Sequence, residues 1–403
     1  QSHEKAMLKK LPNYCRRLST AAAHAHVTHH APVLNEITVH TVRPVTQKAP
    51  PPTTKNEKAL ARDEEYLAAI RKRYPVRSDW TLEEVRALYD WPLLELVREA
   101  GAVHRAYWQD ESEVQRCTLL SIKTGGCTEN CKYCSQSSRY KTHVTPTKQL
   151  KVQEVVEAAE RAKAGGSSRF CMGAAWRELG NKNKAFDDIL EMVSTIKQST
   201  GLEVCATLGM LTESQAVRLK EAGLSAYNHN LDTSRDFYPE VVTTRTYDER
   251  LATIANVRKA GISVCSGGIL GLGEAHADRS AMLHTYATLP GGHPESLPVN
   301  ALVAVSGTPL AGQAPVTALD MARVIALARL LLPRTMVRLS AGRLEFSHAE
   351  QSLMFLAGAN SIFNGDTLLT TPNPDLDQDT QLFTALGLSG VKPVPSHVQT
   401  QSA

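Results

Sequence analysis

Three cysteines within eight residues give the first chemical signal in the sequence. Cys127, Cys131 and Cys134 stand in the stretch CTENCKYC, separated by three and then by two residues. Structural zinc sites are closed by four Cys or His ligands, and cubane iron–sulfur clusters also bind four ligands, normally thiolates. A close group of only three therefore predicts a cubane with one iron left open for a bound molecule. A zinc-binding structural protein is the alternative from a different class.

The other five cysteines are spread singly along the chain. They stand at positions 15, 117, 171, 205 and 265. This spacing is not that of paired bridges, and the chain is too long for a disulfide-framework miniprotein. Reduced thiols in a mitochondrial matrix or cytosol, some of them bound to metal, fit the pattern better.

The segments around these cysteines alternate between short apolar runs and helical patterns. The predicted strands are 117–123, 168–173, 202–209, 225–230, 262–268, 298–305, 335–340 and 359–363. Amphipathic helices are predicted between strands, among them 153–165, 213–223, 247–261 and 318–332. Eight strands coupled to helices over about 250 residues predict an α/β fold, a TIM-type (β/α)8 barrel with an N-terminal helical extension.

The expected organisation has four parts. The sequence predicts a transit peptide and disordered linker at 1–55, N-terminal helices at 56–112, the barrel at 113–367 and a tail at 368–403. The charge of the first 50 residues supports this division, since they hold seven Lys or Arg against two Asp or Glu. From Met7 there is no acidic residue before Glu36, and Lys, Arg, Ser, Thr and Ala are frequent. This composition is typical of a mitochondrial transit peptide; a disordered tail of incidental bias, on a cytoplasmic protein, is the alternative.

The remainder of the chain is close to neutral, with about one negative charge in excess. A near-neutral body argues against a nucleic-acid surface. No uninterrupted apolar run approaches the ~18 residues of a membrane-spanning helix. Neither nucleic acid nor a membrane is therefore an expected partner.

Side chains that alternate along the predicted strands suggest a second site below the triplet. Catalytic groups of such barrels lie at the carboxyl ends of the strands, so the triplet after the first strand is expected at the mouth. Residues i and i+2 of a strand share a face. The faces that carry functional groups are Arg169 with Cys171; Glu203 with Cys205 and Thr207; Asn228 with Asn230 and Asp232; Cys265 with Gly267; and Arg338 with Ser340. The three thiols are either small hydrophobes or part of a second metal site, and the residues alone leave both open.

Several phrases along the barrel carry a resemblance to a known family. C-x3-C-x2-C after the first strand is similar to the cluster motif of the radical S-adenosylmethionine (SAM) superfamily. Within it, the chain resembles the biotin synthase family from about 113 to 373, through GGCTENCKYCSQSSRY, SRFCMGAAW, AYNHNLDTS, CSGGILGLGE, VRLSAGR and AGANSIF. The resemblance implies a sulfurtransferase that converts dethiobiotin to biotin, the last step of biotin synthesis, with a 5′-deoxyadenosyl radical removing hydrogen. Lipoyl synthase is the alternative enzyme, but it needs a second close three-cysteine motif, which is missing here.

The resemblance also implies a role for each matching residue. It assigns Cys127, Cys131 and Cys134 to a [4Fe–4S] cluster, and Cys171, Cys205, Cys265 and Arg338 to a [2Fe–2S] cluster that is the sulfur source. The implied SAM contacts are Tyr133, Ala174, Asn230, Asp232, Arg250 and Ile269, and the implied dethiobiotin contacts are Asn230 and Asn300. From the residues alone Arg338 is an anion clamp, because a charged guanidinium has no free lone pair for iron.

Two stretches of the sequence bear on this resemblance. GAAW stands where many superfamily members have Gly-Gly-Glu, but the implied contact is made by the Ala174 carbonyl, so the change of side chain matters little. GGILGLGE at 267–274 could be taken for a dinucleotide fingerprint, a weak pattern on its own, and it fits the adenine-binding turn of the superfamily. The resemblance further implies three partners: a ferredoxin-type electron donor, the iron–sulfur assembly machinery and a second copy of the chain in a homodimer.

Overall fold

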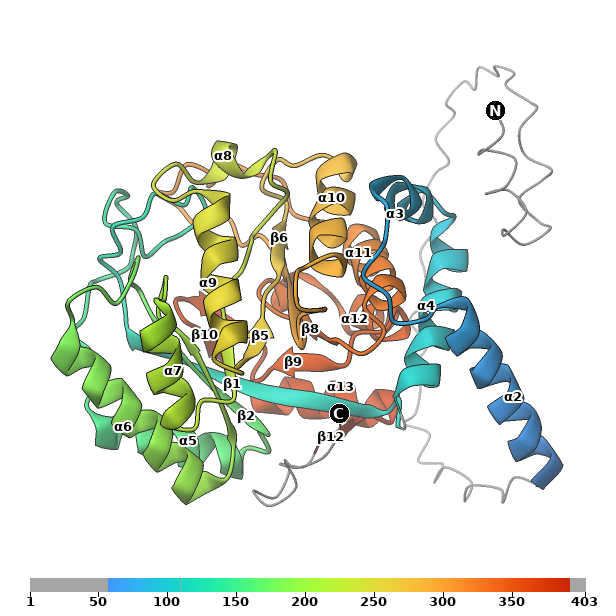
Figure 1. Ribbon diagram of the computed structural model, residues 1–403, viewed down its shortest axis with the longest axis horizontal. Coiled ribbons are helices and arrows are strands. Elements are labelled where there is room, and N and C mark those ends of the chain that lie inside the picture. The colour runs from blue at the N-terminus through green and yellow to red at the C-terminus, as the bar shows by residue number, and fades with distance from the viewer. Residues whose placement is uncertain (1–56, 109, 392–403) are drawn as a thin grey trace, which may run out of the picture. The chain divides into compact units, whose positions relative to one another are not determined.

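A closed parallel barrel forms the centre of the computed structural model, which describes residues 57–108 and 110–391 (Figure 1). Its strands follow one another in the order β1 (Glu113–Lys123), β2 (Arg169–Ala174), β3 (Glu203–Thr207), β4 (Ala226–Asn228), β5 (Ser263–Cys265), β7 (Ser296–Ala301), β8 (Met336–Leu339) and β9 (Ser361–Phe363). Parallel pairing of β9 with β1, with Gln115 opposite Ser361, closes the ring. The predicted TIM-type (β/α)8 fold is confirmed.

One predicted strand is divided in two. The segment expected at 262–268 ends as β5 at Cys265, and a separate β6 (Gly268–Leu270) pairs with β7. At the break, a Cβ on Gly267 would lie 1.9 Å from the carbonyl oxygen of Pro298. Only glycine permits so close an approach of two backbones.

Helices connect the strands and cover the barrel. They are α5 (Val152–Ala164), α6 (Asn183–Thr200), α7 (Glu213–Glu221), α8 (Tyr238–Val241), α9 (Tyr247–Lys259), α10 (His276–Ala287), α11 (Ala318–Leu331) and α12 (His348–Leu356). Local sequence fixes where several of them begin. Thr246 caps α9 by accepting from the Glu249 amide, and the Glu249 carboxylate accepts from the Thr246 amide. This reciprocal capping box satisfies two backbone donors that the helix itself leaves unpaired.

The N-terminal helices cover one side of the barrel. They are α2 (Glu57–Arg73), α3 (Leu82–Tyr89) and α4 (Leu93–Tyr107), and α3 and α4 pack against α10 and α11 (Figure 1). This second layer explains why α11 is almost entirely apolar and buried, since a helix that is hydrophobic all round must be covered on all sides. Arg323 of α11 donates to the carbonyls of Tyr89 and Trp91, which ties the two layers together.

Residues 368–391 are folded, which differs from the tail expected there. A hairpin of β10 (Thr367–Leu368) and β11 (Thr371–Pro372) is followed by α13 (Leu376–Leu386), and β12 (Ser389–Gly390) pairs with the start of β1. The sequence holds a signal for this helix, because Asp375 and Gln378 form a capping box at its start. The predicted leader at 1–55 and the last residues, 392–403, lie outside the described residues. Among the described helices, none has the length and apolar character needed to cross a bilayer.

Truncating an anchor of α13 tests whether this segment is part of the folded unit. Phe383 is 3% exposed and packs edge-on against Phe355, with the Arg116 guanidinium 4.6 Å from its ring centre. We expect Phe383→Ala to lower the free energy of unfolding by about 3–5 kcal/mol, as is usual for a buried phenylalanine. Chemical denaturation measures the loss. Leu386→Ala, on the same helix but 36% exposed, is the control and should change stability little; equal behaviour of the two variants would contradict the packing.

Candidate active site

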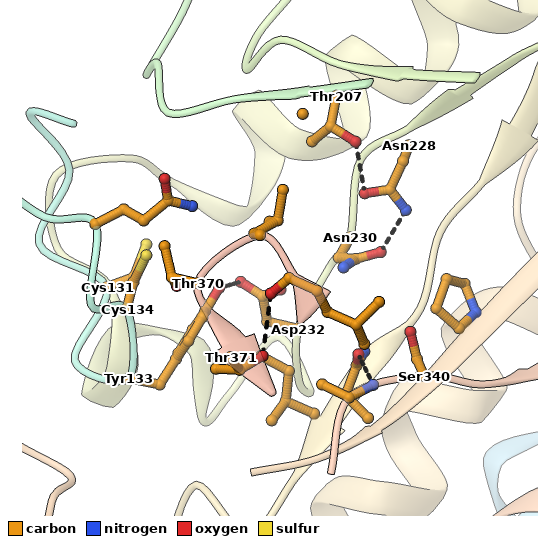
Figure 2. A pocket seen from close by; sticks show the side chains of 18 of the residues that line it. Cys131, Tyr133, Cys134, Thr207, Asn228, Asn230, Asp232, Ser340, Thr370 and Thr371 are labelled. Atoms are coloured by element: carbon orange, nitrogen blue, oxygen red, sulfur yellow. Dashed lines mark hydrogen bonds between the residues drawn. The ribbon is translucent and has the colours of Figure 1, made fainter. Parts of the chain in front are cut away.

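A cavity of about 340 Å³ lies at the carboxyl ends of the strands. Every residue to which the sequence analysis gave a role lines it: Cys127, Cys131, Tyr133, Cys134, Cys171, Ala174, Cys205, Asn230, Asp232, Arg250, Cys265, Ile269, Asn300 and Arg338. Figure 2 shows Cys131 and Cys134 on one side of this cavity and Asn228 and Asn230 on another, with Asp232 and Thr370 between them. The structure therefore brings the predicted residues together in one place.

The loop after β1 holds the three outer cysteines. It turns sharply through Gly125 and Gly126, whose φ angles of 65° and 69° are in the left-handed region that favours glycine. The Cys127 amide then donates to the Gln136 carbonyl at 3.0 Å, and the Ser138 amide donates to the Cys127 carbonyl at 2.7 Å. These bonds fold the triplet into a compact loop at the mouth of the barrel.

Three charged residues in and around this loop were not predicted from the sequence. Glu129 lies between Cys127 and Cys131, is 4% exposed, and has the guanidinium groups of Arg177 and Arg245 at 3.3 and 3.6 Å. A buried carboxylate between two arginines fixes the loop to the segments after β2 and before α9. No periodicity marks Glu129, because it belongs to a loop; only its position between two cysteines could have drawn attention to it.

The outer thiols are protonated in the absence of a metal. Burial raises the pKa of Cys131 to about 12 and that of Cys134 to about 11. Only the thiolate binds metal, so iron must displace these protons. Among the described residues, no group of three His, Cys, Asp or Glu side chains converges on a single metal ion.

The inner thiols line the barrel wall below the loop. Cys171 on β2 is paired in register with Cys205 on β3, and Cys265 ends β5. All three are at most 4% exposed. A hydrogen bond from Cys205 and the nearby Arg338 charge lower the pKa of Cys265 to about 6, against the effect of burial. Three soft sulfur groups on β2, β3 and β5, one of them with a lowered pKa, fit an iron–sulfur cluster held by the protein.

Arg338 is buried beside these thiols. Its Nε donates to Ser361 Oγ at 2.9 Å, its Nη2 to Gln115 Oε1 at 3.0 Å, and its Nη1 to Cys265 Sγ at 3.6 Å. A further buried thiol, Cys117 of β1, packs in the same cluster of side chains. No role was predicted for Cys117 from the sequence.

A buried ion pair lies on the other side of the cavity. Arg250 Nη2 is 2.6 Å from Asp232 Oδ2, and Arg250 Nε donates to the Tyr238 hydroxyl at 2.7 Å. Tyr133 also donates to Asp232 Oδ2, at 2.9 Å (Figure 2). Burial opposes the charge of Arg250, but the Asp232 carboxylate raises the pKa of Arg250 well above its usual value. Arg250 is therefore charged at neutral pH, and its contacts with Asp232 and Tyr238 hold it in position.

Asp232 does not continue the register of β4, as the alternation rule suggested. The strand ends at Asn228, and Asp232 has a φ of 68°, a conformation uncommon for a residue other than glycine. Its backbone pairs instead with Gly268 at the start of β6. The carboxylate reaches the cavity through this turn, and such strained backbone is frequent at functional sites.

Asparagine side chains form a connected group above the inner thiols. Thr207 donates to Asn228 Oδ1 at 3.3 Å, and Asn228 Nδ2 donates to Asn230 Oδ1 at 3.0 Å (Figure 2). Asn230 Oδ1 also accepts from the Gly267 amide, which leaves its amide nitrogen for other partners. Asn300 Nδ2 donates to the Gly268 carbonyl, and Asn300 Oδ1 accepts from the Ala341 amide. Asn228 also lines the cavity, although no contact with SAM or substrate was predicted for it from the sequence.

The β10–β11 hairpin lies over the mouth of the cavity. Leu368, Leu369, Thr370 and Thr371 all line it, and the Thr370 and Ser135 hydroxyls are 2.8 Å apart. The hairpin also approaches β2 closely, since a Cβ on Gly173 would lie 2.7 Å from Leu369 Cδ2. The segment expected as a tail therefore contributes directly to the site.

Two family models match the barrel region. The model of the radical SAM superfamily matches residues 121–285, and the model of the biotin and thiamin synthesis associated domain matches residues 298–389. Curated relatives match over most of their length. The chain is 56% identical over 326 residues to mitochondrial biotin synthase of Arabidopsis thaliana (81% of this chain, 85% of the relative) and 59% identical over 317 residues to biotin synthase of Sorangium cellulosum (79% and 90%).

Solved structures share the fold at low sequence identity. Methylornithine synthase aligns with a TM-score of 0.66 at 19% identity, over 82% of this chain and 97% of that one. A maturase of the [FeFe]-hydrogenase aligns with a TM-score of 0.68 at 19% identity, over 84% and 77%. These two support the architecture, while the sequence relatives and the motif support the more specific assignment. The chain belongs to the biotin synthase family of the radical SAM superfamily.

Proposed function

We propose that this cavity inserts sulfur into dethiobiotin to make biotin, with the outer thiols at its mouth and the inner thiols at its base as the two cluster sites. The observation that carries the proposal is the division of six cysteines into two groups that line one cavity. A biotin synthase uses a [4Fe–4S] cluster, SAM and a [2Fe–2S] cluster. When bound, these groups supply hydrogen-atom abstraction from unactivated C–H bonds and the sulfur atom that is inserted.

The cysteines divide the ligand roles between the two layers. Cys127, Cys131 and Cys134 would hold the [4Fe–4S] cluster and leave one iron for SAM. Cys171, Cys205, Cys265 and Arg338 would hold the [2Fe–2S] cluster. Support comes from the exclusion of solvent, since Cys131 and the inner thiols are at most 7% exposed and the hairpin covers the mouth. A site that confines a reactive species must exclude competing reactions with water.

The Asp232–Arg250 pair is suited to bind SAM. Arg250 presents a planar fork with five donors, of which the Asp232, Tyr238 and Asn230 contacts use three. The remaining donors can bind a carboxylate, while the second Asp232 oxygen can accept from ribose hydroxyls. Tyr133, Ile269 and the Ala174 carbonyl complete the proposed SAM contacts, all on the cavity wall.

The asparagines are suited to hold the ureido ring of dethiobiotin. A urea presents one carbonyl acceptor and two N–H donors, and each asparagine side chain offers both kinds of group. We assign this role to Asn230 and Asn300. The hydroxyls of Thr370 and Thr371 line the cavity nearby and are available to the polar end of the substrate. The backbone bonds of Asn300 hold its amide in one orientation before the substrate arrives, which lowers the cost of ordering on binding.

Partners and location follow from the chemistry proposed. Reductive cleavage of SAM needs one electron at a time, which a ferredoxin-type protein delivers. Because the inner cluster gives up sulfur, iron–sulfur assembly machinery must rebuild it. We further propose a homodimer in the mitochondrial matrix; the basic leader and the mitochondrial relative of Arabidopsis thaliana support this location.

The direct test is to purify the full chain without oxygen and to reconstitute it with iron and sulfide. We expect visible absorption from iron–sulfur clusters, and biotin formation when dethiobiotin, SAM and a low-potential reductant are added. A colourless protein that binds zinc instead would reject the proposal. 5′-Deoxyadenosine release without biotin would keep the SAM site and reject the sulfur-donor site.

Asn300→Ala tests the substrate contact. We expect the KM for dethiobiotin to rise by about 10- to 100-fold, since one or two hydrogen bonds to a buried polar ligand are lost, while SAM still binds. Steady-state biotin formation at varied dethiobiotin measures this. Asn256→Ala is the matched control, because Asn256 bonds a backbone carbonyl of Leu211 and is not part of the cavity lining. An unchanged KM in Asn300→Ala would remove this residue from the substrate site.

A further inference from the structure

Cys117 occupies a place in the inner site that the proposed cluster ligands do not explain. It is fully buried on β1, with its side chain packed among Cys171, Cys205, Cys265 and Phe363. In the β1–β2 register, Cys117 stands opposite Arg169, two residues before the position that pairs with Cys171. Because alternate residues share a face, Cys117 points into the same interior as the three inner thiols, one layer further down.

Cys117 and the three inner thiols belong to one buried cluster of side chains. Cys171 and Cys205 are paired in register on adjacent strands, and Cys265 ends β5. The last of these thiols accepts from Arg338. Four thiols and one guanidinium therefore lie together in the barrel interior, although the [2Fe–2S] cluster takes four protein ligands.

Cys117 and Arg338 share two neighbours. The Cys117 thiol donates to Gln115 Oε1 at 3.5 Å and lies 3.9 Å from Ser361 Oγ. Arg338 donates to the same two oxygens, at 3.0 and 2.9 Å. The two side chains therefore reach the same point of the barrel wall from β1 and β8, which lie on either side of β9.

The chemistry of the two groups favours the thiol. A charged guanidinium has no free lone pair, so Arg338 would have to lose a proton before it could bind iron. A thiolate is the usual ligand of iron in such clusters. To bind iron, the Cys117 thiol loses its proton to solvent as the Fe–S bond forms, without any change of oxidation state.

We propose that Cys117 is an alternative fourth ligand of the inner iron–sulfur cluster, able to take the coordination position assigned to Arg338. This inference rests on the proposed function, since it requires an inner cluster on Cys171, Cys205 and Cys265. It predicts that the inner site tolerates loss of Arg338 or loss of Cys117, but not loss of both.

The test compares cluster content in four full-length proteins: wild type, Arg338→Ala, Cys117→Ser and the double variant. Each is reconstituted with ⁵⁷Fe without oxygen, and Mössbauer spectroscopy counts [2Fe–2S] and [4Fe–4S] iron in the same sample. We expect both single variants to retain most of the [2Fe–2S] iron and the double variant to lose about tenfold. The [4Fe–4S] iron on the outer triplet should remain in all four proteins and reports that the barrel is folded.

A matched control separates loss of the thiol from general disturbance of the pocket. The double variant Ser361→Ala/Arg338→Ala removes Ser361, which contacts both Cys117 and Arg338, but keeps the Cys117 thiol. Its inner site should bind as much iron as that of Arg338→Ala. A second pair of proteins, Arg338→Gln with and without Cys117→Ser, repeats the comparison with a polar side chain that can still bond Gln115 and Ser361. This second pair replaces the Arg338→Ala pair as the test if the Arg338→Ala proteins also lose the outer cluster.

The outcomes are distinct. Loss of the inner cluster in Arg338→Ala alone overturns the proposal, because Cys117 then fails to replace the arginine. Equal loading of Arg338→Ala and the double variant also overturns it, because the thiol then contributes nothing. Absence of [2Fe–2S] iron from the wild-type protein rejects the proposed function itself rather than the role of Cys117.

Discussion

Cys131→Ala protein is expected to release 5′-deoxyadenosine from SAM at less than about 1% of the wild-type rate. Two thiolates cannot hold a cubane that keeps one iron open for SAM, and loss of a metal ligand exceeds the 10- to 100-fold effects of mutations around a metal site. Chromatographic assay of 5′-deoxyadenosine under reducing conditions measures the rate.

Lys132→Ala is the control for Cys131→Ala. Lys132 follows Cys131 in the same loop, and its side chain has no role in the proposed site. This variant should cleave SAM at close to the wild-type rate. If Cys131→Ala also cleaves SAM at a near wild-type rate, the assignment of radical chemistry to the outer triplet is wrong.

Cys205→Ala is expected to separate the two halves of the reaction. The variant should form no biotin, because the inner site loses a ligand and the sulfur source with it. Reductive cleavage of SAM should continue at a measurable level, because the outer triplet and the Asp232–Arg250 pair lie on other segments and keep their contacts. Biotin and 5′-deoxyadenosine are measured in the same reaction.

A purely structural role for Cys205 gives a different result. The residue is 1% exposed, and a packed thiol of this kind contributes at most ~1–2 kcal/mol to stability when replaced by alanine. Product would then still appear, with only a lower midpoint of unfolding. Biotin formation by the reconstituted Cys205→Ala protein would falsify the sulfur-donor role of the inner site.

The sequence predicted the barrel and the inward-facing thiols because both depend on simple periodicities. Cys171, Cys205 and Cys265 lie on short strands, where a period of two places every second residue inside. Tyr133, Asp232 and Arg250 came from the family resemblance, since Asp232 reaches the cavity through a left-handed backbone conformation that alternation does not describe.

The residues that the sequence did not reveal depend on contacts between distant segments. Thr370 and Thr371 line the cavity because a hairpin near the end of the chain folds back over the loop after β1. The position of Cys117 beside Arg338 becomes evident only through their common neighbour Ser361, which lies 244 residues after Cys117 in the sequence. No local pattern encodes such pairings, because they depend on the closure of the whole barrel.

That closure has a consequence for the order of events during synthesis of the protein. The ring closes only when β9 pairs with β1, and Gln115 and Ser361 are 246 residues apart. A ribosome adds about 5–20 residues each second, so Cys127 emerges many seconds before Arg338 and β9 can complete the wall beneath it. Neither thiol layer is sheltered until then. Iron should therefore bind after translation has finished, when β1 and β9 are both present and the barrel can close around the thiols.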